Sequence, residues 1–254
     1  RLFLILTIVF PIIICAQDIH WLPELDTMKI VAKNKIAFLI ANTNYHNDLL
    51  DLKTPSNDMV VLSKSLEKLQ FDIISKENVT LNELREIVVE FQDTIHSYDF
   101  GVFYYAGHGF ENEKGDPYII PVDVSDLKSL EKNSESVTDI VNILGSFNTK
   151  CLFILDACRD EGNNGIGEPK KVKKQAVNIK LAYSTSPGYR ASDEVFMDQS
   201  TLYASALSYY FEKAGKLTIQ QIFNNIYEIV MKESDGLQRP TTFYGQEVNK
   251  VRFK

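Results

Sequence analysis

Short apolar runs alternate along this chain with longer segments in which apolar residues recur every three or four positions. The short runs have the length of single strands and are apolar on both faces, which is typical of strands buried in a parallel sheet. Buried strands are therefore predicted at residues 35–41, 71–74, 100–106, 151–155 and 179–183.

The longer segments have the apolar spacing of amphipathic helices. Thr54-Pro55 is typical of a helix start, and Thr80 with Glu83 forms a capping-box pattern, as does Thr218 with Gln221. Helices are predicted over residues 55–69, 81–96, 137–144 and 202–211, with another beginning at residue 219.

Strands that alternate with helices predict an α/β fold with a mainly parallel sheet and helices on both faces. Residues 17–34 are interpreted as a linker, residues 118–122 as a short hairpin element and residues 161–174 as a loop. In such folds the chemistry gathers at the carboxyl ends of the strands.

The amino end predicts a signal peptide over residues 1–16. Arg1 is followed by an apolar run from Leu2 to Ile14, and Ala16 offers a small residue for cleavage. Thirteen apolar residues are short for a membrane span, which needs about 20. The protein is therefore expected to be exported, secreted or periplasmic, and to contact a membrane only through an uncleaved amino-terminal segment.

Composition narrows the function classes further. The 254 residues are 44% hydrophobic and 24% charged, so the chain can bury a full core. The formal net charge of −7 argues against nucleic acid as a partner. Cys151 and Cys158 lie seven residues apart, about 20 Å along an extended strand, which is too far for a disulfide. Cys151 is interpreted as a core residue.

His108 and Cys158 are the residues with the strongest chemical signal. His108 follows the predicted strand 100–106 and Cys158 follows the strand 151–155, so a parallel sheet brings both to one edge. An imidazole can accept the proton of a thiol and later deliver it to a leaving amine. The amide groups of Gly109 and Cys158 are candidates to stabilise an oxyanion.

The sequence around these two residues resembles the caspase-like cysteine peptidases, and most closely their paracaspase and metacaspase branch. The two matching motifs are Tyr104-Tyr105-Ala106-Gly107-His108-Gly109 and Leu155-Asp156-Ala157-Cys158-Arg159. The resemblance covers residues 35 to about 245 and implies a caspase-type sandwich over residues 35–254. It also implies a large-subunit-like part to about residue 160 and a small-subunit-like part from about residue 177.

The resemblance also implies specificity for Arg or Lys. True caspases, which cut after Asp, have Gln two positions before the nucleophile, where this chain has Asp156. By motif matching, the pocket for the basic side chain is formed by Asp58, Asp156 and Asp193, with Glu194 as an adjacent candidate. Carboxylates that share a pocket repel one another unless a cation joins them, and a guanidinium suits that role.

The predicted function is a cysteine endopeptidase that cleaves protein or peptide substrates after Arg or Lys. It is expected to process itself in the loop 160–176, or at Arg159 or Arg190, although a solvated charged loop explains that segment equally well. No cofactor or metal is predicted, calcium activation is left open, and the oligomeric state is not predicted.

Two alternatives remain. The first is a caspase-like domain that signals by binding and is catalytically silent, against which both members of the Cys-His pair are present. The second is a nucleotide- or flavin-binding doubly wound domain, which needs a Gly-rich phosphate loop after the first strand. The loop Asn42-Thr43-Asn44-Tyr45-His46-Asn47 contains no glycine.

Overall fold

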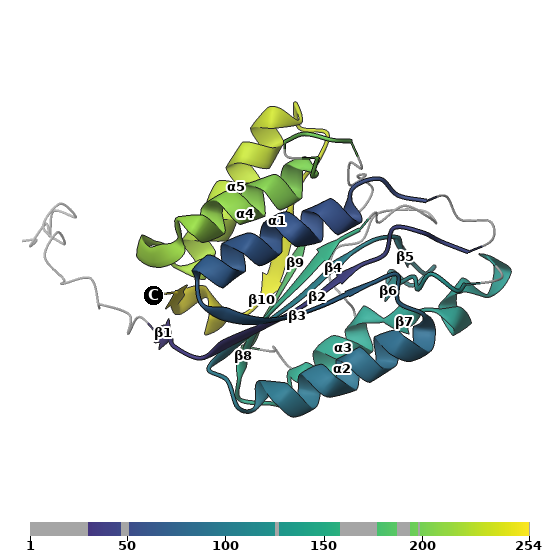
Figure 1. Cartoon of the computed structure of the whole chain (residues 1–254), viewed down its shortest axis with the longest axis horizontal. Coiled ribbons are helices and arrows are strands. Elements are labelled where there is room, and N and C mark those ends of the chain that lie inside the picture. Colours follow the sequence, from purple (N-terminus) through teal and green to yellow (C-terminus); the bar gives the residue numbers. More distant parts are fainter. Residues whose placement is uncertain are drawn as a thin grey trace, which may run out of the picture.

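Six strands form the central sheet, in the order β10-β9-β8-β4-β2-β3 (Figure 1). The structure is a computed structural model that describes residues 30–46, 51–124, 127–157, 177–186, 194–197 and 199–253. The strands of this sheet are β2 (Lys35–Ala41), β3 (Phe71–Glu77), β4 (Phe100–Ala106), β8 (Lys150–Asp156), β9 (Ile179–Tyr183) and β10 (Thr241–Tyr244). All neighbours pair in parallel except β10, which is antiparallel to β9.

Helices cover both faces of the sheet (Figure 1). One face carries α1 (Pro55–Lys68), α4 (Leu202–Glu212) and α5 (Ile219–Glu233), and the other carries α2 (Leu81–Ile95) and α3 (Val137–Leu144). The mainly parallel sheet with helices on both faces, predicted from the alternation of elements, is confirmed, and so is the α/β sandwich that the resemblance implied. None of the helices in the described ranges is long and apolar enough to cross a membrane.

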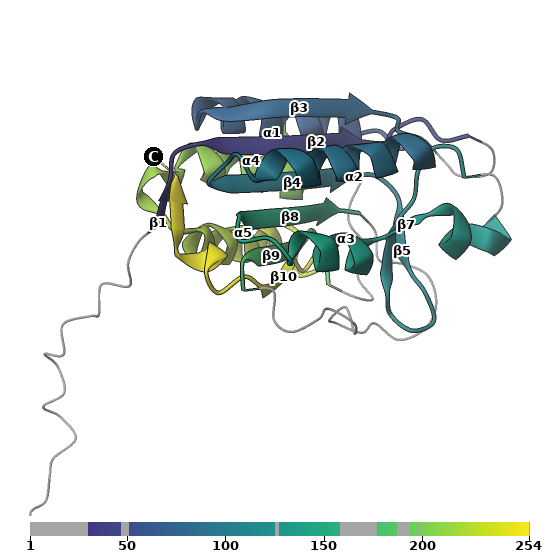
Figure 2. The same cartoon turned by 90° about the horizontal axis from the view of Figure 1, so that it is seen from below.

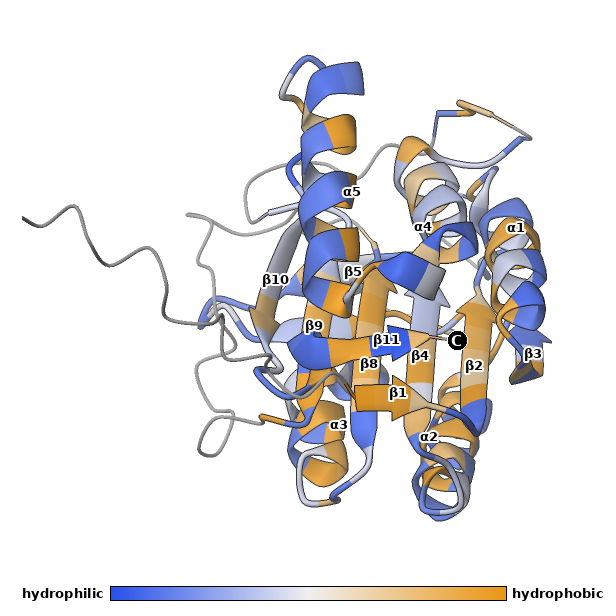
Figure 3. Ribbon diagram, turned by 90° about the vertical axis from the view of Figure 1, so that its left-hand side faces the viewer, coloured by the Kyte–Doolittle hydropathy of each residue, from blue (hydrophilic) through white to orange (hydrophobic). Residues whose placement is uncertain are grey.

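Successive side chains along the buried strands pack alternately into two separate hydrophobic cores, one on each face of the sheet. In β4, Val102 and Tyr104 pack into the core under α1, α4 and α5, whereas Phe103 and Tyr105 pack into the core over α2 and α3. Successive strand side chains point to opposite faces, so a run without polar residues fills both cores. In Figure 3 the strands are mostly coloured hydrophobic, and the helices carry hydrophilic colour on their outer sides.

The helix starts follow the expected capping chemistry. Thr80 accepts from the backbone N–H of Glu83 and Thr218 from that of Gln221, and both capping boxes are complete. Thr201 caps α4 by accepting from the N–H of Ala204. These side chains satisfy N–H groups that the first turn of a helix leaves without an intrahelical partner.

Several short elements were not expected from the sequence. Part of the predicted linker, Ile30–Ala32, is a strand (β1) that pairs in parallel with β11 (Val251–Phe253), so the linker interpretation is wrong for these three residues. The edge strand β10 was also missed. Each of these elements is only three or four residues long, and its pairing partner lies far away in sequence.

A second sheet stands beyond the carboxyl ends of the main strands (Figure 2). It consists of β5 (Gly109–Glu111), β6 (Pro117–Ile119) and β7 (Glu135–Ser136), all antiparallel. The predicted hairpin element at residues 118–122 overlaps β6. A small apolar cluster that includes Tyr45, Phe110 and Ile120 packs here.

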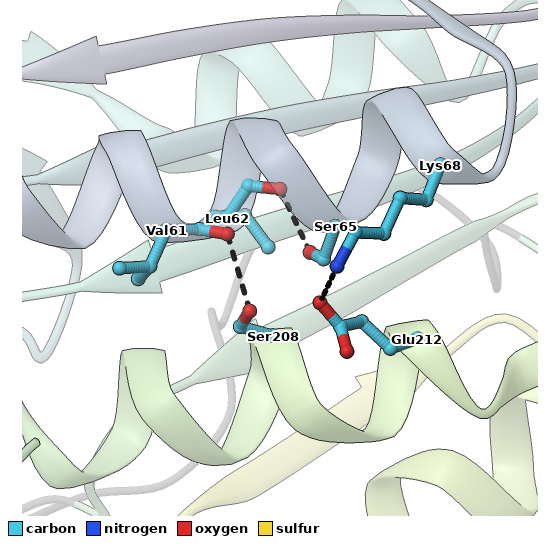
Figure 4. Close-up of polar contacts among 6 residues, drawn as sticks. All are labelled: Val61, Leu62, Ser65, Lys68, Ser208 and Glu212. Carbon is cyan, nitrogen blue, oxygen red and sulfur yellow. Dashed lines mark hydrogen bonds and ion pairs between the residues drawn. The ribbon is translucent and has the colours of Figure 1, made fainter. Parts of the chain in front are cut away.

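Helices α1 and α4 run side by side in the same direction (Figure 4). Ser208 donates to the carbonyl of Val61 at 3.1 Å, and one turn or more further along both helices Lys68 pairs with Glu212. The parallel packing brings the amino ends of the two helices together. The first turn of α1 therefore lies against the N-cap of α4.

Candidate active site

The carboxyl ends of β4 and β8 lie next to each other in the sheet. Ala106 is the register partner of Asp156, and the N–H of Gly107 donates to the carbonyl of Asp156 at 3.2 Å. His108 follows one residue later. A backbone hydrogen bond therefore joins the two strand ends. The sequence predicted that a parallel sheet would bring these two ends to one edge.

His108 is fixed through its main chain by tyrosine hydroxyls. Its N–H donates to the hydroxyl of Tyr45 at 2.7 Å, and its carbonyl accepts from the Tyr105 hydroxyl at 2.8 Å and from the N–H of Ile120 at 3.1 Å. The rings of His108 and Tyr45 lie 4.5 Å apart between centroids, tilted by 57°. The half-buried imidazole therefore sits on a tyrosine ring and a rigid backbone.

The hydroxyls that hold His108 are neutral. Burial raises the pKa of Tyr45 and of Tyr105 above the usual tyrosine value. Asn42 extends the network, because its side-chain amide donates to the Ile120 carbonyl at 3.2 Å and its oxygen accepts from the N–H of Val79 at 2.9 Å. None of these bonds changes protonation near neutral pH.

Gly107 is required by this arrangement. A Cβ atom at this position would lie 2.5 Å from the Tyr105 hydroxyl and 2.6 Å from the Tyr45 hydroxyl. Both tyrosines are buried side chains with little room to move. The glycine lets the main chain pass close to the two hydroxyls that hold His108.

Gly109 begins β5 and pairs with Ile119 of β6. The neighbouring bond from the Ile120 N–H to the His108 carbonyl makes Gly109–Ile119 a non-hydrogen-bonded pair of the antiparallel ladder. The Gly109 N–H is therefore directed away from β6. It points outward from β5, which is an edge strand of the three-stranded sheet, and it belongs to the residue that follows His108.

Asp58 and Asp156 come from different elements and meet at the N-cap of α4. The backbone N–H of Thr201 donates to Oδ1 of Asp58 at 2.6 Å, and the Thr201 hydroxyl lies 3.4 Å from Oδ2 of Asp156. The Tyr104 hydroxyl also donates to Oδ2 of Asp156, at 3.3 Å. Asp58 is 1% exposed and Asp156 is 7% exposed, so the structure forms a buried acidic pair.

The two carboxyl groups affect each other's charge. Burial, and then the neighbouring charge of Asp156, raises the pKa of Asp58 to about 8, while hydrogen bonds from Thr201 and Thr54 act in the opposite direction. Burial and the same carboxylates raise the pKa of Tyr104 well above its usual value. The acidic pair therefore retains a proton at a pH where an exposed carboxyl is fully ionised.

The structure brings Asp58 and Asp156 together, and it places His108, followed by Gly109, just after the neighbouring strand end of β4. Cys158 and Asp193 lie outside the described residues. Cys158 comes two positions after Asp156, the last residue of β8. The alternative acid, Glu194, is exposed.

Sequence reasoning missed the groups that hold these side chains. Thr201 had a weak signal, since a threonine directly before a predicted helix is a good N-cap. Tyr45 lay in a loop with no pattern that predicted contact with His108, and only the fold places it there.

Cys151 is confirmed as a core residue. It is 1% exposed inside β8, and burial raises the pKa of its thiol. Within the described ranges, no group of three or more His, Cys, Asp or Glu side chains is arranged to hold a metal ion.

The sandwich architecture, together with the sequence, defines the class of this protein. The family model described as "Caspase domain" matches residues 34–248, and the chain belongs to this family. The family is one of cysteine peptidases, which confirms the class of enzyme expected from the two motifs.

Curated relatives point to the paracaspase-type branch. The chain is 34% identical over 170 residues to the human mucosa-associated lymphoid tissue lymphoma translocation protein 1, and 32% identical over 168 residues to its mouse homolog. The matches cover 66% and 65% of this chain but only 20% of each relative. The resemblance to caspase-like peptidases of the paracaspase type is confirmed.

Proposed function

We propose that this protein is a cysteine endopeptidase that cleaves peptide bonds after Arg or Lys. The observation that carries the proposal is the buried pair of Asp58 and Asp156 beside the strand end that bears His108. Two buried carboxylates without a cation are costly. A pocket that holds them together suits a guanidinium or ammonium group, which would neutralise both.

In the proposed reaction His108 takes the proton of the Cys158 thiol, and the thiolate sulfur attacks the carbonyl carbon of the scissile bond. The N–H groups of Gly109 and Cys158 stabilise the resulting oxyanion. His108 then gives its proton to the departing amine as the C–N bond breaks, which leaves a thioester. A water molecule hydrolyses the thioester and regenerates the thiol.

The geometry around His108 supports this role. Its backbone is held on both sides by neutral hydrogen bonds, and its ring lies on Tyr45. Catalytic groups must be positioned to within a fraction of an ångström, because displacement by about 1 Å can cost about 100-fold in rate. The N–H of Gly109, the residue after His108, points away from β6 and is therefore available to stabilise an oxyanion.

The substrate pocket in this proposal is formed by Asp58, Asp156 and Asp193. The first two come from α1 and β8, and the third comes from the motif match alone. A basic side chain in this pocket would donate hydrogen bonds to carboxylate oxygens, and Arg offers a planar donor set for two of them.

The test is an assay of the full chain on matched fluorogenic peptides that end in Arg, Lys or Asp, with and without calcium, beside Cys158→Ala. We expect cleavage after Arg and Lys that is lost in Cys158→Ala and does not depend on calcium. Cleavage after Asp would overturn the pocket assignment. If none of the peptides is cleaved, the result would favour the catalytically silent binding domain.

We further propose that the enzyme is exported and that it processes itself in the segment 160–176, which lies outside the described residues. Mass spectrometry of the active enzyme after expression with the whole sequence tests both points. A chain that begins at Gln17 supports export, and an active enzyme that stays intact between residues 160 and 176 rules out the self-processing.

A further inference from the structure

A buried glutamine in the loop after α5 holds the main chain at the end of β9. The side-chain amide of Gln238 donates from Nε2 to the carbonyl oxygen of Ser184 at 3.0 Å. Ser184 directly follows the last residue of β9 and is fully buried, and Gln238 is 3% exposed. This hydrogen bond joins the loop 234–240 to the strand that lies next to β8.

Ser184 lies beside Asp156 in the sheet. β8 and β9 run parallel with Leu155 opposite Tyr183, and Asp156 and Ser184 are the next residues on the two strands. The N–H of Ser184 donates to the carbonyl of Leu155 at 2.9 Å, which continues the ladder past the end of β9. Neighbouring strands lie about 4.8 Å apart. Gln238 therefore holds the main chain at a position adjacent to one member of the acidic pair.

Ser184 also begins the chain segment that returns to the acidic pair. This pocket segment, residues 184–201, ends at Thr201, whose N–H binds Asp58 at 2.6 Å and whose hydroxyl lies 3.4 Å from Asp156. Asp193, the third pocket residue by motif match, belongs to it but lies outside the described residues. The position of Ser184 therefore sets where the pocket segment leaves the sheet.

Gln238 is itself fixed within its loop. Its N–H donates to Oγ of Ser234 at 3.0 Å, and the Ser234 hydroxyl donates back to the carbonyl of Gln238 at 3.3 Å. A second contact lies alongside, because the hydroxyl of Ser186 donates to the carbonyl of Arg239 at 2.7 Å. The loop follows α5 directly and leads directly into β10. Two hydrogen bonds thus tie the start of the pocket segment to the frame formed by α5 and β10.

Resting on the proposed function, we propose that Gln238 is a positioning residue of the substrate pocket: its amide fixes the carbonyl of Ser184, and with it the start of the pocket segment beside Asp156. Gln238 acts through Ser184 and takes no part in the making or breaking of bonds. A basic side chain needs both carboxyl groups of the pair in place at once, because hydrogen bonds weaken steeply when their geometry is poor. Without the amide donor, a buried carbonyl is left unsatisfied and the main chain shifts to satisfy it.

Gln238→Met tests this role in the full chain. Methionine keeps the length of the side chain, and Oε1 of Gln238 makes no hydrogen bond within the described part of the chain, so only the bond to Ser184 is lost. We expect the KM of Arg and Lys peptides to rise about fivefold or more, the effect of one lost bond to a buried acceptor. The value of kcat should change less than KM, because separate bonds from Tyr45 and Tyr105 hold the backbone of His108.

Asn178→Leu is the matched control on the same strand. Asn178 directly precedes β9, and its side-chain amide donates to the carbonyl of Phe147 and, at 3.3 Å, to that of Thr149. It therefore performs the same kind of task at the amino end of the strand, away from the acidic pair. We expect Asn178→Leu to lower the midpoint of thermal unfolding and to leave KM unchanged.

Ser186→Ala is a milder variant of the same contact. Ser186 is half-buried, and its substitution removes the hydrogen bond to the carbonyl of Arg239. We expect KM to rise as in Gln238→Met, but by less. If Gln238→Met does not fold, an unchanged KM in Ser186→Ala overturns the proposal.

The kinetics and the thermal unfolding of these variants together separate the outcomes. A higher KM in Gln238→Met than in Asn178→Leu, at a comparable loss of stability, supports the positioning role. A Gln238→Met enzyme that is less stable but keeps the original KM has lost only a structural bond, which overturns the positioning role and leaves the proposed function intact. If the unsubstituted chain cleaves neither Arg nor Lys peptides, the proposed basic specificity fails, and the positioning role fails with it.

Discussion

The ends of β4 and β8 lie side by side in the sheet, but the residues at the two ends have very different surroundings. After β4, the backbone of His108 is held by the hydroxyls of Tyr45 and Tyr105. At the end of β8, Asp156 lies near Asp58, and burial raises the pKa of Asp58 to about 8. The hydroxyls that hold the backbone in the first region are neutral, whereas the second region holds two carboxyl groups that repel each other when both are ionised.

This difference suits the two tasks proposed for the site. A general base must stay in one position whatever the pH, and neutral buried hydrogen bonds provide that. A pocket for a cation gains selectivity from charge that is unfavourable until the cation binds. Variants that disturb only one region should therefore give distinct kinetic signatures.

Gly107→Ala should have the largest effect. The new Cβ would overlap the hydroxyls of Tyr45 and Tyr105, so the backbone of His108 would shift. We expect kcat to fall about 100-fold and the free energy of unfolding to drop by about 1–3 kcal/mol. Steady-state kinetics and urea unfolding measure the two effects. The control is Gly215→Ala, where a Cβ meets no atom within 4 Å, and equal losses in both variants would contradict the crowding at Gly107.

Asp58→Asn should change how stability depends on pH. The pKa of Asp58 is raised on folding, from about 4 to about 8, so the folded state binds more protons between these values. Stability therefore falls as pH rises through this window, by up to about 1.4 kcal/mol per pH unit. The amide of the Asp58→Asn variant cannot ionise, so urea unfolding of this variant should show a smaller loss from pH 5 to pH 8. Identical pH profiles would refute the raised pKa.

A matched pair of tyrosine variants sharpens the contrast between the regions. Tyr45→Phe removes the acceptor of the His108 N–H, and Tyr104→Phe removes a donor to Asp156. Each hydrogen bond is worth about 1 kcal/mol, or roughly fivefold. We expect Tyr45→Phe to lower kcat, and Tyr104→Phe to raise the KM of Arg peptides. The same kinetic change in both variants would show that the two regions are not separate.

Lys68→Ala should have the smallest effect. Its ion pair with Glu212 joins α1 to α4 on the surface (Figure 4), and the two side chains are 64% and 42% exposed. Exposed pairs contribute about 0–1 kcal/mol. Thermal unfolding should change little and KM for Arg peptides should stay the same. A marked change in KM would show that the pair, and not buried packing, sets the relative position of Asp58 and Thr201.

The long elements were predictable because their signals are local. The runs at Lys35–Ala41 and Phe100–Ala106 match the strands residue for residue, since a strand buried on both faces consists mostly of apolar residues. The capping threonines Thr80 and Thr218 marked the starts of α2 and α5, because a capping box is a pattern of four neighbouring residues. By contrast, β1, β10 and β11 are short, and their pairing partners lie far away along the chain.

Local sequence patterns encoded the alternation of strands and helices, the class of fold and the two strand ends that precede His108 and Cys158 in the chain. These depend on periodicity and on residue type, which are properties of neighbouring positions. The packing of distant elements was needed to place Tyr45 against the backbone of His108 and Thr201 between Asp58 and Asp156. Those contacts span 63, 143 and 45 residues, and no local pattern encodes them because they exist only once the sheet and the parallel pair of α1 and α4 have packed.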